Sequence, residues 1–452
     1  MNKARYLYLA LMMLLLAGCT SYGVIDNPAL KSITDSSNDY SWRNWAKSDH
    51  NHDLDLMLSF SGGGTRAAAM SYGVLQGLRD TTVMIDGKPV RLLDEVDQIS
   101  SVSGGSFTAA YYGLNGDGIF ETFREAFLER DVEQHLFWGL ANPIEWFRQG
   151  GRTEMAIRYY NDKVFHGATF ADINKDGPLI VINASGLGHG IRFSFLQEYF
   201  NLICSDLSSF PVAKAVAASS SVPVVFLPVV LEKYPGCDSK EPEWLQAAKL
   251  RAKETQDPIL AESIAGIEVL RKKEPLQYLH LVDGGITDNL GLHALYDLVT
   301  LAGGAKKTLD RMNVKPPSRL VVISVNSSTE PEPNMDISRE EPSISETVSA
   351  MSSVQLHRYN SSTLKLMETS VKQWAEEIST PEHQVKTYFI RIGLRDITKP
   401  ELRLIFNKIP TSFGLSKEVI DHLVNGGKNL LHNDPEYQRL VSDLQGQING
   451  KN

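Results

Sequence analysis

Three short apolar runs, far apart in the chain, each end in a small polar residue next to glycine. Leu56–Phe60 is followed by Ser-Gly-Gly-Gly-Thr-Arg, Ile99–Val102 by Ser103-Gly-Gly, and Leu281–Val282 by Asp283-Gly-Gly. Short apolar runs bounded by glycine are typical of buried strands, and strands that alternate with helical runs form a parallel sheet. Ligands and reacting groups gather at the carboxyl ends of such strands. The sequence therefore predicts an α/β fold with a mostly parallel central sheet and a site built from these three ends.

The first end carries three consecutive glycines, Gly62, Gly63 and Gly64, before a predicted helix over residues 65–79. The N–H groups at a helix start have no partner within the helix and favour negative charge. They would form a cradle for an oxyanion. With Asp86 further on, the same glycines also fit a loose dinucleotide-binding fingerprint, and a tight turn without chemistry is a third interpretation. The glycines alone leave all three open.

The second end places Ser103 between a strand and a predicted helix over residues 104–114. A nucleophile on a strand-to-helix elbow needs small neighbours, because the two backbones crowd there. Gly105 meets this need, whereas Ser101 stands where glycine is usual. Ser103 is therefore the candidate nucleophile of a serine hydrolase, with a Ser/Gly-rich turn as the alternative.

The third end places Asp283 after an apolar strand and before two glycines. As a partner of Ser103 it would act as general base directly, without an intervening histidine. Its alternative role is to cap the following turn. His280, three residues earlier on the strand, projects to the opposite face, so we interpret it as a packed core histidine.

In this order and combination the motifs resemble the patatin-like phospholipases over about residues 54–289. That family has a glycine-rich oxyanion loop with a following Arg, a serine elbow, and a distant Asp-Gly-Gly or Asp-Gly-Ala. The stretch 213–228 is also similar to the family's block between the nucleophile and the aspartate. The matching positions are Gly62, Gly63, Gly64, Arg66, Ser103, Gly105, Asp283 and Gly284. The departures are Ser61, Ala67, Ser101 and a long insertion before Asp283.

The resemblance implies a three-layer α/β/α sandwich that hydrolyses a carboxylic ester of a phospholipid, lysophospholipid or related lipid. Ser103 and Asp283 would form the catalytic dyad, the amides of residues 62–64 the oxyanion hole, and Arg66 would orient a phosphate or support the loop. Arg66 paired with a helix carboxylate is the structural alternative. This chemistry requires no metal and no cofactor.

Two other functions remain open. One is an α/β-hydrolase with a Ser-His-Asp triad; the histidines that would serve it are His293, His357, His383, His422 and His432. The other is a patatin-fold lipoprotein without catalysis, a binding or scaffold module.

The amino terminus predicts export. Residues 1–18 combine an early positive charge with a short apolar run, which is typical of a signal peptide and too short for a comfortable membrane span. The run ends in Leu-Ala-Gly-Cys19, which resembles the bacterial lipobox, so Cys19 is the expected lipidation site, for example by palmitate. A plain cleaved signal peptide and an uncleaved anchor are the alternatives. Because Thr20 rather than Asp follows, we expect an outer-membrane lipoprotein that faces the periplasm and is held by its lipid anchor.

The composition divides the chain into five parts, of which the signal peptide is the first. The other four are a polar tether over 19–52, a catalytic core over 53–326 with a charged helical insertion at about 238–275, a linker or mobile loop over 327–343, and a C-terminal helical extension over 344–452 packed on the core. Within the extension we expect a long helix over 345–378 and a strand over 387–392. The insertion is either a lid over an apolar site or a solvated surface element.

Charge and cysteine content exclude some partners. The net charge of −9 disfavours nucleic acids and anionic membrane surfaces as electrostatic partners. Cys204 and Cys237 form either one disulfide or two unpaired structural thiols, and with no nearby pair of histidines they do not make a zinc site. Aromatic residues are dense over 118–160, where spacing favours core packing over a fatty-acyl pocket.

Overall fold

The computed structural model describes residues 23–33, 39–45, 53–85, 87–134, 151–223, 225–237, 241–330, 334–337 and 339–445. The predicted signal peptide, Cys19, Asp86 and part of the aromatic segment lie outside these residues. The aromatic residues concerned are Phe137, Trp138, Trp146 and Phe147.

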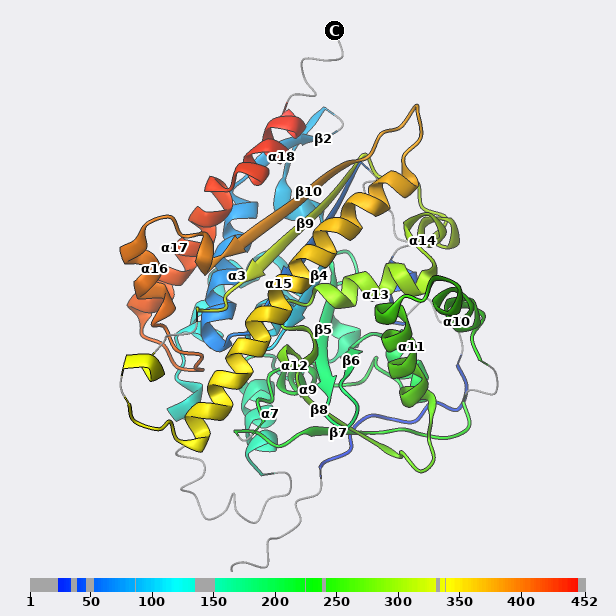
Figure 1. The fold of residues 1–452 in the computed structure, drawn as a ribbon, viewed down its shortest axis with the longest axis horizontal. Helices are drawn as coiled ribbons and strands as arrows, with labels where there is room; N and C mark the ends of the chain where they lie inside the picture. Colours follow the sequence, from blue (N-terminus) through cyan, green and yellow to red (C-terminus); the bar gives the residue numbers. More distant parts are fainter. Residues whose placement is uncertain are drawn as a thin grey trace, which may run out of the picture.

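The body is built on one sheet with the strand order β10-β9-β1-β4-β5-β8-β7, and β6 pairs with β5 (Figure 1). The strands are β1 (Leu54–Phe60), β4 (Val96–Val102), β5 (Leu179–Gly186), β6 (Ile191–Ser194), β7 (Val229–Glu232), β8 (Tyr278–Asp283), β9 (Arg319–Asn326) and β10 (Lys386–Gly393). From β10 to β5 all neighbours are parallel. A separate antiparallel hairpin is formed by β2 (Thr82–Ile85) and β3 (Lys88–Arg91).

Helices cover both faces of this sheet. The principal ones are α3 (Gly64–Arg79), α4 (Gly104–Asn115), α13 (Leu292–Ala302), α14 (Ala305–Met312), α15 (Ile344–Ile378) and α17 (Lys417–Asn433). The others are α2 (Trp42–Trp45), α5 (Ile119–Phe123), α7 (Gly151–Lys163), α8 (Gln197–Leu202), α9 (Val212–Ser219), α10 (Glu243–Thr255), α11 (Pro258–Arg271), α12 (Gly285–Asp288), α16 (Pro400–Asn407) and α18 (Pro435–Gln445).

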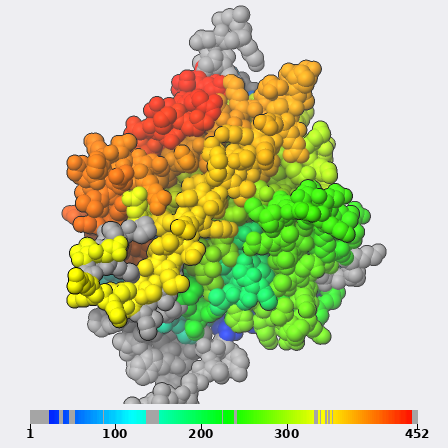
Figure 2. Space-filling view, in the orientation of Figure 1, coloured from blue at the N-terminus to red at the C-terminus, as the bar shows by residue number. Residues whose placement is uncertain are grey.

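Alternate residues of the central strands pack into two separate hydrophobic cores, because successive side chains on a strand point to opposite faces of the sheet. Leu58 of β1 packs with residues of α3, α4 and α17, whereas its neighbour Met57 packs with residues of α13, α14 and α15. Ile323 and Val322 of β9 divide in the same way. Figure 2 shows α15 running across one face between the C-terminal helices and the region of α10 and α11. The structure is the predicted α/β/α sandwich.

The strand that ends in Asp283 does not run parallel to its neighbours. β8 is antiparallel to β5, and Asp283 stands opposite Ala184. β5 pairs with β4 only as far as Asn183 and then continues beyond the end of β4. β8 therefore runs back along this projecting part of β5 and brings Asp283 to the carboxyl end of β4, where Ser103 follows.

The described part of the predicted tether is packed against the body. The Tyr40 hydroxyl accepts from the N–H of Ile180 at 2.8 Å and donates to its carbonyl at 3.1 Å. Asn27 is buried and donates to Ser205 and to the carbonyl of Glu232. The polar composition predicted a solvated tether over 19–52, but polar side chains can also be buried when they find hydrogen-bond partners. The expectation of a tether is therefore wrong for Asn27 and Tyr40.

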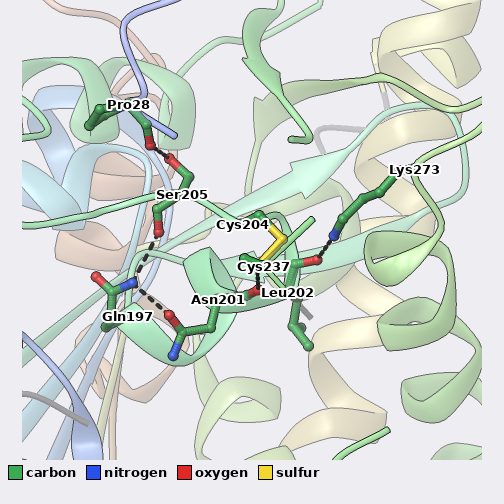
Figure 3. The surroundings of a disulfide bond; sticks show 8 residues. All are labelled: Pro28, Gln197, Asn201, Leu202, Cys204, Ser205, Cys237 and Lys273. Atoms are coloured by element: carbon green, nitrogen blue, oxygen red, sulfur yellow. Dashed lines mark hydrogen bonds between the residues drawn. A yellow bond between two sulfur atoms is a disulfide. The ribbon is translucent and has the colours of Figure 1, made fainter. Parts of the chain in front are cut away.

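The insertion before β8 forms two helices, α10 and α11, that lie beside α13 and β6. Leu245 and Leu260 are buried in the core, so this element is a packed layer with a charged outer surface. Just before it, Cys204 and Cys237 form a disulfide with a Cα–Cα distance of 5.5 Å (Figure 3). Lys273 donates to the carbonyl of Leu202 beside this bond.

The C-terminal segment is part of the sheet rather than an added helical extension. β10 pairs with β9 along its whole length and forms one edge of the sheet. α17 packs directly on α3. The preceding linker also begins inside the body, because Ser327 and Ser328 are buried.

Among the described aromatic residues of the segment 118–160, core packing holds. Phe123 and Phe127 are buried, and Phe127 stacks on Phe107 with ring centroids 4.0 Å apart.

Candidate active site

Ser103 occupies a tight elbow between β4 and α4. Its backbone has φ 51° and ψ −121°, a conformation that residues with a side chain rarely adopt. The elbow presses against β1 and the glycine loop, because a Cβ on Gly104 would lie 2.0 Å from the carbonyl oxygen of Gly64 and one on Gly105 would lie 2.7 Å from Cβ of Phe60. Ser101, where glycine is usual, is accommodated because its hydroxyl donates to the carbonyl of Val181 at 3.2 Å.

The Ser103 hydroxyl donates to Oδ2 of Asp283 at 2.7 Å. The other carboxylate oxygen, Oδ1, accepts the N–H of Gly285 at 2.8 Å. Both Ser103 and Asp283 are buried, and burial raises the pKa of Asp283 to about 6, although the bonds from Ser103 and Gly285 lower it. The two residues lie 180 positions apart in the chain and meet directly, with no third group between them.

The glycine loop lies against Ser103. A Cβ on Gly62 would lie 3.3 Å from the Cβ of Ser103. The N–H of Gly62 donates to the carbonyl of Asn289 at 3.0 Å, and that of Thr65 donates to Ser412 at 2.9 Å. Within the described part of the chain, the N–H groups of Gly63 and Gly64 have no partner. Both have positive φ, 140° and 60°, so only glycine fits this bend without strain.

Arg66 supports the loop. Its side chain is buried and donates to the carbonyl of Ser327 at 2.8 Å, to the carbonyl of Ile409 and to the Thr411 hydroxyl at 3.0 Å. Burial lowers the pKa of its guanidinium to about 10. The side chain thus ties the start of α3 to the segments after β9 and α16, and it pairs with no carboxylate in the described structure.

Two residues that the sequence did not single out, Ser219 and Asn289, hold these parts together. Ser219 accepts the N–H of Ser103 at 2.8 Å and donates to the carbonyl of Asn183 at 2.6 Å. The backbone carbonyl of Asn289 accepts the N–H of Gly62, and its side-chain amide donates to the Ser328 hydroxyl at 3.3 Å. Ser219 lies in the stretch 213–228 already noted for its resemblance, and this was the one signal for it.

Among the described residues no histidine contacts Ser103 or Asp283. The side chain of His293 bonds Thr363, His357 bonds Arg395, His383 bonds the carbonyl of Pro317, and His432 bonds the carbonyl of Gly77. His422 and His280 are exposed. The interpretation of His280 as a core residue is wrong, because Tyr278 and His280 are exposed at the start of β8 while Leu279 between them is buried.

The sequence profile of the patatin-like phospholipases matches residues 58–296, which is more than half of the chain and includes Ser103 and Asp283. The chain belongs to the patatin-like phospholipase family. This confirms the resemblance seen in the motifs, and membership supports a lipid-hydrolysing activity. No curated protein sequence matches the chain significantly.

Several solved structures are similar in fold to this patatin-like chain. Human GIVD cytosolic phospholipase A2 is 12% identical, with 96% of this chain and 69% of that chain covered and a TM-score of 0.43. The same enzyme in complex with methyl gamma-linolenyl fluorophosphonate is 12% identical, with 90% and 62% covered and a TM-score of 0.38. VipD from Legionella pneumophila is 12% identical, with 92% and 73% covered and a TM-score of 0.32.

Of the helices in the described ranges, none has both the length and the apolar character needed to cross a bilayer.

Proposed function

We propose that this protein is a serine acyl hydrolase that cleaves a carboxylic ester of a phospholipid or lysophospholipid, with Ser103 as nucleophile and Asp283 as general base. The observation that supports the proposal is the 2.7 Å hydrogen bond from the Ser103 hydroxyl to the buried carboxylate, at an elbow held in a strained conformation. Strained backbone of this kind clusters at functional sites.

In the first half-reaction, Oγ of Ser103 attacks the ester carbonyl and its proton passes to Oδ2 of Asp283. Negative charge develops on the carbonyl oxygen, and the N–H groups of Gly63 and Gly64 are the donors proposed to receive it. The Gly62 N–H already donates to the carbonyl of Asn289, so we do not assign it as an oxyanion donor. Its lack of a side chain lets the loop pass close to Ser103. Collapse of the intermediate breaks the ester bond, and protonated Asp283 gives its proton to the leaving oxygen.

In the second half-reaction, Asp283 takes a proton from water, which attacks the acyl-Ser103 ester. The resulting tetrahedral intermediate releases the fatty acid, and the proton returns to Oγ of Ser103. A pKa of about 6 suits both duties, because the carboxylate is mostly ionised at neutral pH yet accepts a proton more readily than an exposed aspartate. These steps need no cofactor and no metal.

We further propose that the enzyme works as a lipid-anchored protein of the bacterial outer membrane, facing the periplasm, with Cys19 as the lipidated residue. The disulfide between Cys204 and Cys237 supports this location, because disulfides persist in oxidising compartments. Loss of palmitate incorporation in Cys19→Ala, with incorporation retained in Thr20→Ala, is the expected result of metabolic labelling.

The test of the reaction is labelling by a fluorophosphonate probe together with fatty acid release from phosphatidylcholine vesicles, followed by mass spectrometry. Ser103→Ala should abolish both. Asp283→Asn should lower both by at least a thousandfold while the protein remains folded by circular dichroism. His293→Ala and His357→Ala are the controls, and neither should remove activity.

A loss of activity in one of the histidine variants alone would favour a Ser-His-Asp triad instead. An intact protein that neither labels nor releases fatty acid would favour a non-catalytic member of the family.

A further inference from the structure

A partly open cavity lies at the opposite edge of the sheet from Ser103. It has a volume of about 120 Å³ and is surrounded by the amino ends of β1, β4 and β9 together with α2, α13, α14 and α15. In Figure 1 α14 lies at the upper right, on the side where β9 and β10 begin. Ser103 follows the carboxyl end of β4, so the cavity is separated from the candidate active site by the length of the strands.

The walls of the cavity are mainly apolar and aromatic. Three tryptophans, Trp42, Trp45 and Trp374, line it together with aliphatic side chains of α13 and α14 such as Leu295 and Leu309. Aromatic faces attract organic cations, tryptophan most strongly. An engineered cavity of about 150 Å³ holds benzene, so this space accommodates a ligand of about six to eight non-hydrogen atoms with part of it in the opening.

Two carboxylates are set into this apolar wall. Asp55 lies on β1 and Asp97 on the neighbouring strand β4. The pairing of these strands slips by one residue between Leu56 and Met57, which leaves Asp97 unpaired in the register, and its Oδ2 accepts the Leu56 N–H at 2.6 Å in place of a ladder bond. Such a bulge re-aims a side chain, here toward the cavity.

The two carboxylates have no counter-ion in the described structure. No ion pair joins either of them to a basic side chain, and Lys315, the basic residue among the described residues that line the cavity, is exposed and bonds neither. Burial and the neighbouring charge of Asp55 raise the pKa of Asp97, and burial raises that of Asp55 to about 6. The raised pKa values reflect two carboxyls that repel each other as carboxylates in an apolar wall, and a bound cation would favour their ionised forms.

A third polar group points to the same conclusion. Thr308 of α14 lines the cavity and is 5% exposed, and its hydroxyl has no hydrogen-bond partner among the described residues. A buried hydroxyl without a partner is uncommon in a native structure and indicates a missing water or ligand atom. Three polar groups therefore converge on one small apolar space.

We propose that this cavity binds a small primary ammonium ion with an apolar body. The ammonium group would donate hydrogen bonds to Asp55, Asp97 and the Thr308 hydroxyl, and the apolar body would lie against the tryptophans. A neutral ligand of the same shape would leave the carboxylates uncompensated, and an anion would be repelled.

The test compares benzylammonium with benzyl alcohol, its neutral isostere, as ligands of the intact Ser103→Ala protein at pH 7.5. Binding is followed by calorimetry and by tryptophan fluorescence. We expect benzylammonium to bind at least tenfold more tightly than benzyl alcohol. The Asp55→Asn/Asp97→Asn double variant should reduce this preference to less than twofold, whereas Asp310→Asn, on the exposed side of α14, should leave it unchanged.

A further variant tests the proposal even if the double variant does not fold. Ala305→Leu adds volume to the cavity wall without changing charge and should weaken both ligands by at least fivefold. Equal affinity for the two ligands, a preference that survives in the double variant, or no binding of benzylammonium at 20 mM would overturn the proposal. Because the nucleophile is absent from every protein used, these outcomes are independent of the hydrolase reaction.

Discussion

Ser103 holds a backbone conformation that costs on the order of 1–3 kcal/mol for a residue with a side chain. Its surroundings fix that conformation from two sides. Gly104 lets the chain pass the carbonyl of Gly64, and the N–H of Ser103 is held by the Ser219 hydroxyl at 2.8 Å. The result is a hydroxyl that reaches Asp283 without any movement of the backbone, so the hydrogen bond of the proposed dyad is already formed in this structure.

The pH dependence of the proposed reaction follows from the environment of Asp283. Only the ionised carboxylate can accept the Ser103 proton, and burial raises its pKa to about 6. Activity should therefore rise with increasing pH through about 6 and level off above 7. A kcat/KM profile from pH 4.5 to 8.5 measures this limb. Asp288, buried with a pKa of about 6 and without a bond to Ser103, provides the control, since Asp288→Asn should keep the same limb.

The same burial makes the ionised Asp283 a cost to folding. Its pKa of about 6 in the folded protein lies above the ordinary aspartate value of 3.8. The contribution of this group to stability is therefore present below the ordinary value and is lost as pH rises through about 6. At pH 8 the loss approaches about 3 kcal/mol at 1.36 kcal/mol per pKa unit. Asp283→Asn should thus be more stable than the parent at pH 8, by up to about 3 kcal/mol, with a smaller difference at pH 5. Urea unfolding at the two pH values tests this, and a variant that is less stable at pH 8 would contradict it.

At the scale of helices and strands, local patterns decided which elements could be predicted. α3, α4, α15 and β10 follow periodic or apolar runs, and the structure has them close to the expected bounds. The direction of β8 could not be predicted, because a strand's direction depends on the loop that returns the chain to the sheet. Asp283 was nevertheless placed correctly near Ser103, because β5 projects beyond β4 and gives β8 a partner there.

Contacts between distant segments were invisible in the sequence for the same reason. Arg66 donates hydrogen bonds to Ser327 and Thr411, and the N–H of Gly62 donates to Asn289. Each of these bonds joins residues that are more than 200 positions apart in the chain. The motifs identified Ser103, Asp283 and the glycine loop, because each is marked by glycines next to it in the sequence. They did not identify the supporting groups, whose role exists only after folding.

The packing of α17 on α3 yields a prediction about the element that carries the glycine loop. The two helices touch through backbone, because a Cβ on Gly427 would lie 2.4 Å from the carbonyl oxygen of Met70 and one on Gly73 would lie 2.0 Å from that of Val424. Gly427→Ala should destabilise the protein by about 1–3 kcal/mol despite the better helix propensity of alanine. Denaturant unfolding measures this, with Gly118→Ala as the control, where the nearest atom is 3.6 Å from the added Cβ and little change is expected.

At the scale of the whole molecule, both ends of the described chain are incorporated into the body. Asp26 pairs with the buried Lys214 at 2.6 Å, and β10 completes an edge of the sheet after more than 380 residues. Because the edge strand β10 comes so late in the chain, the sheet cannot form fully until this strand is available. The C-terminal segment therefore belongs to the catalytic core in physical terms, and the five-part division drawn from composition describes the order of the chain rather than separate folding units.

The disulfide gives the molecule-wide prediction. Cys204 and Cys237 close a loop with a sequence separation of 33, for which chain entropy predicts a stabilisation of about 3–4 kcal/mol. The bond lies beside Leu202 and Lys273 (Figure 3). In the described part of the chain, neither cysteine takes part in the side-chain hydrogen bonds of Ser103 and Asp283, which involve Ser219, Gly285 and each other. Reduction by dithiothreitol should therefore lower the melting temperature by several degrees while the rate of fluorophosphonate labelling at 25 °C stays within twofold. The Cys204→Ala/Cys237→Ala variant should melt at the lower temperature with or without reductant. A parent protein whose melting temperature does not respond to reductant would show that the two cysteines are not bonded in solution, and the support that this bond lends to a periplasmic location would be withdrawn with it.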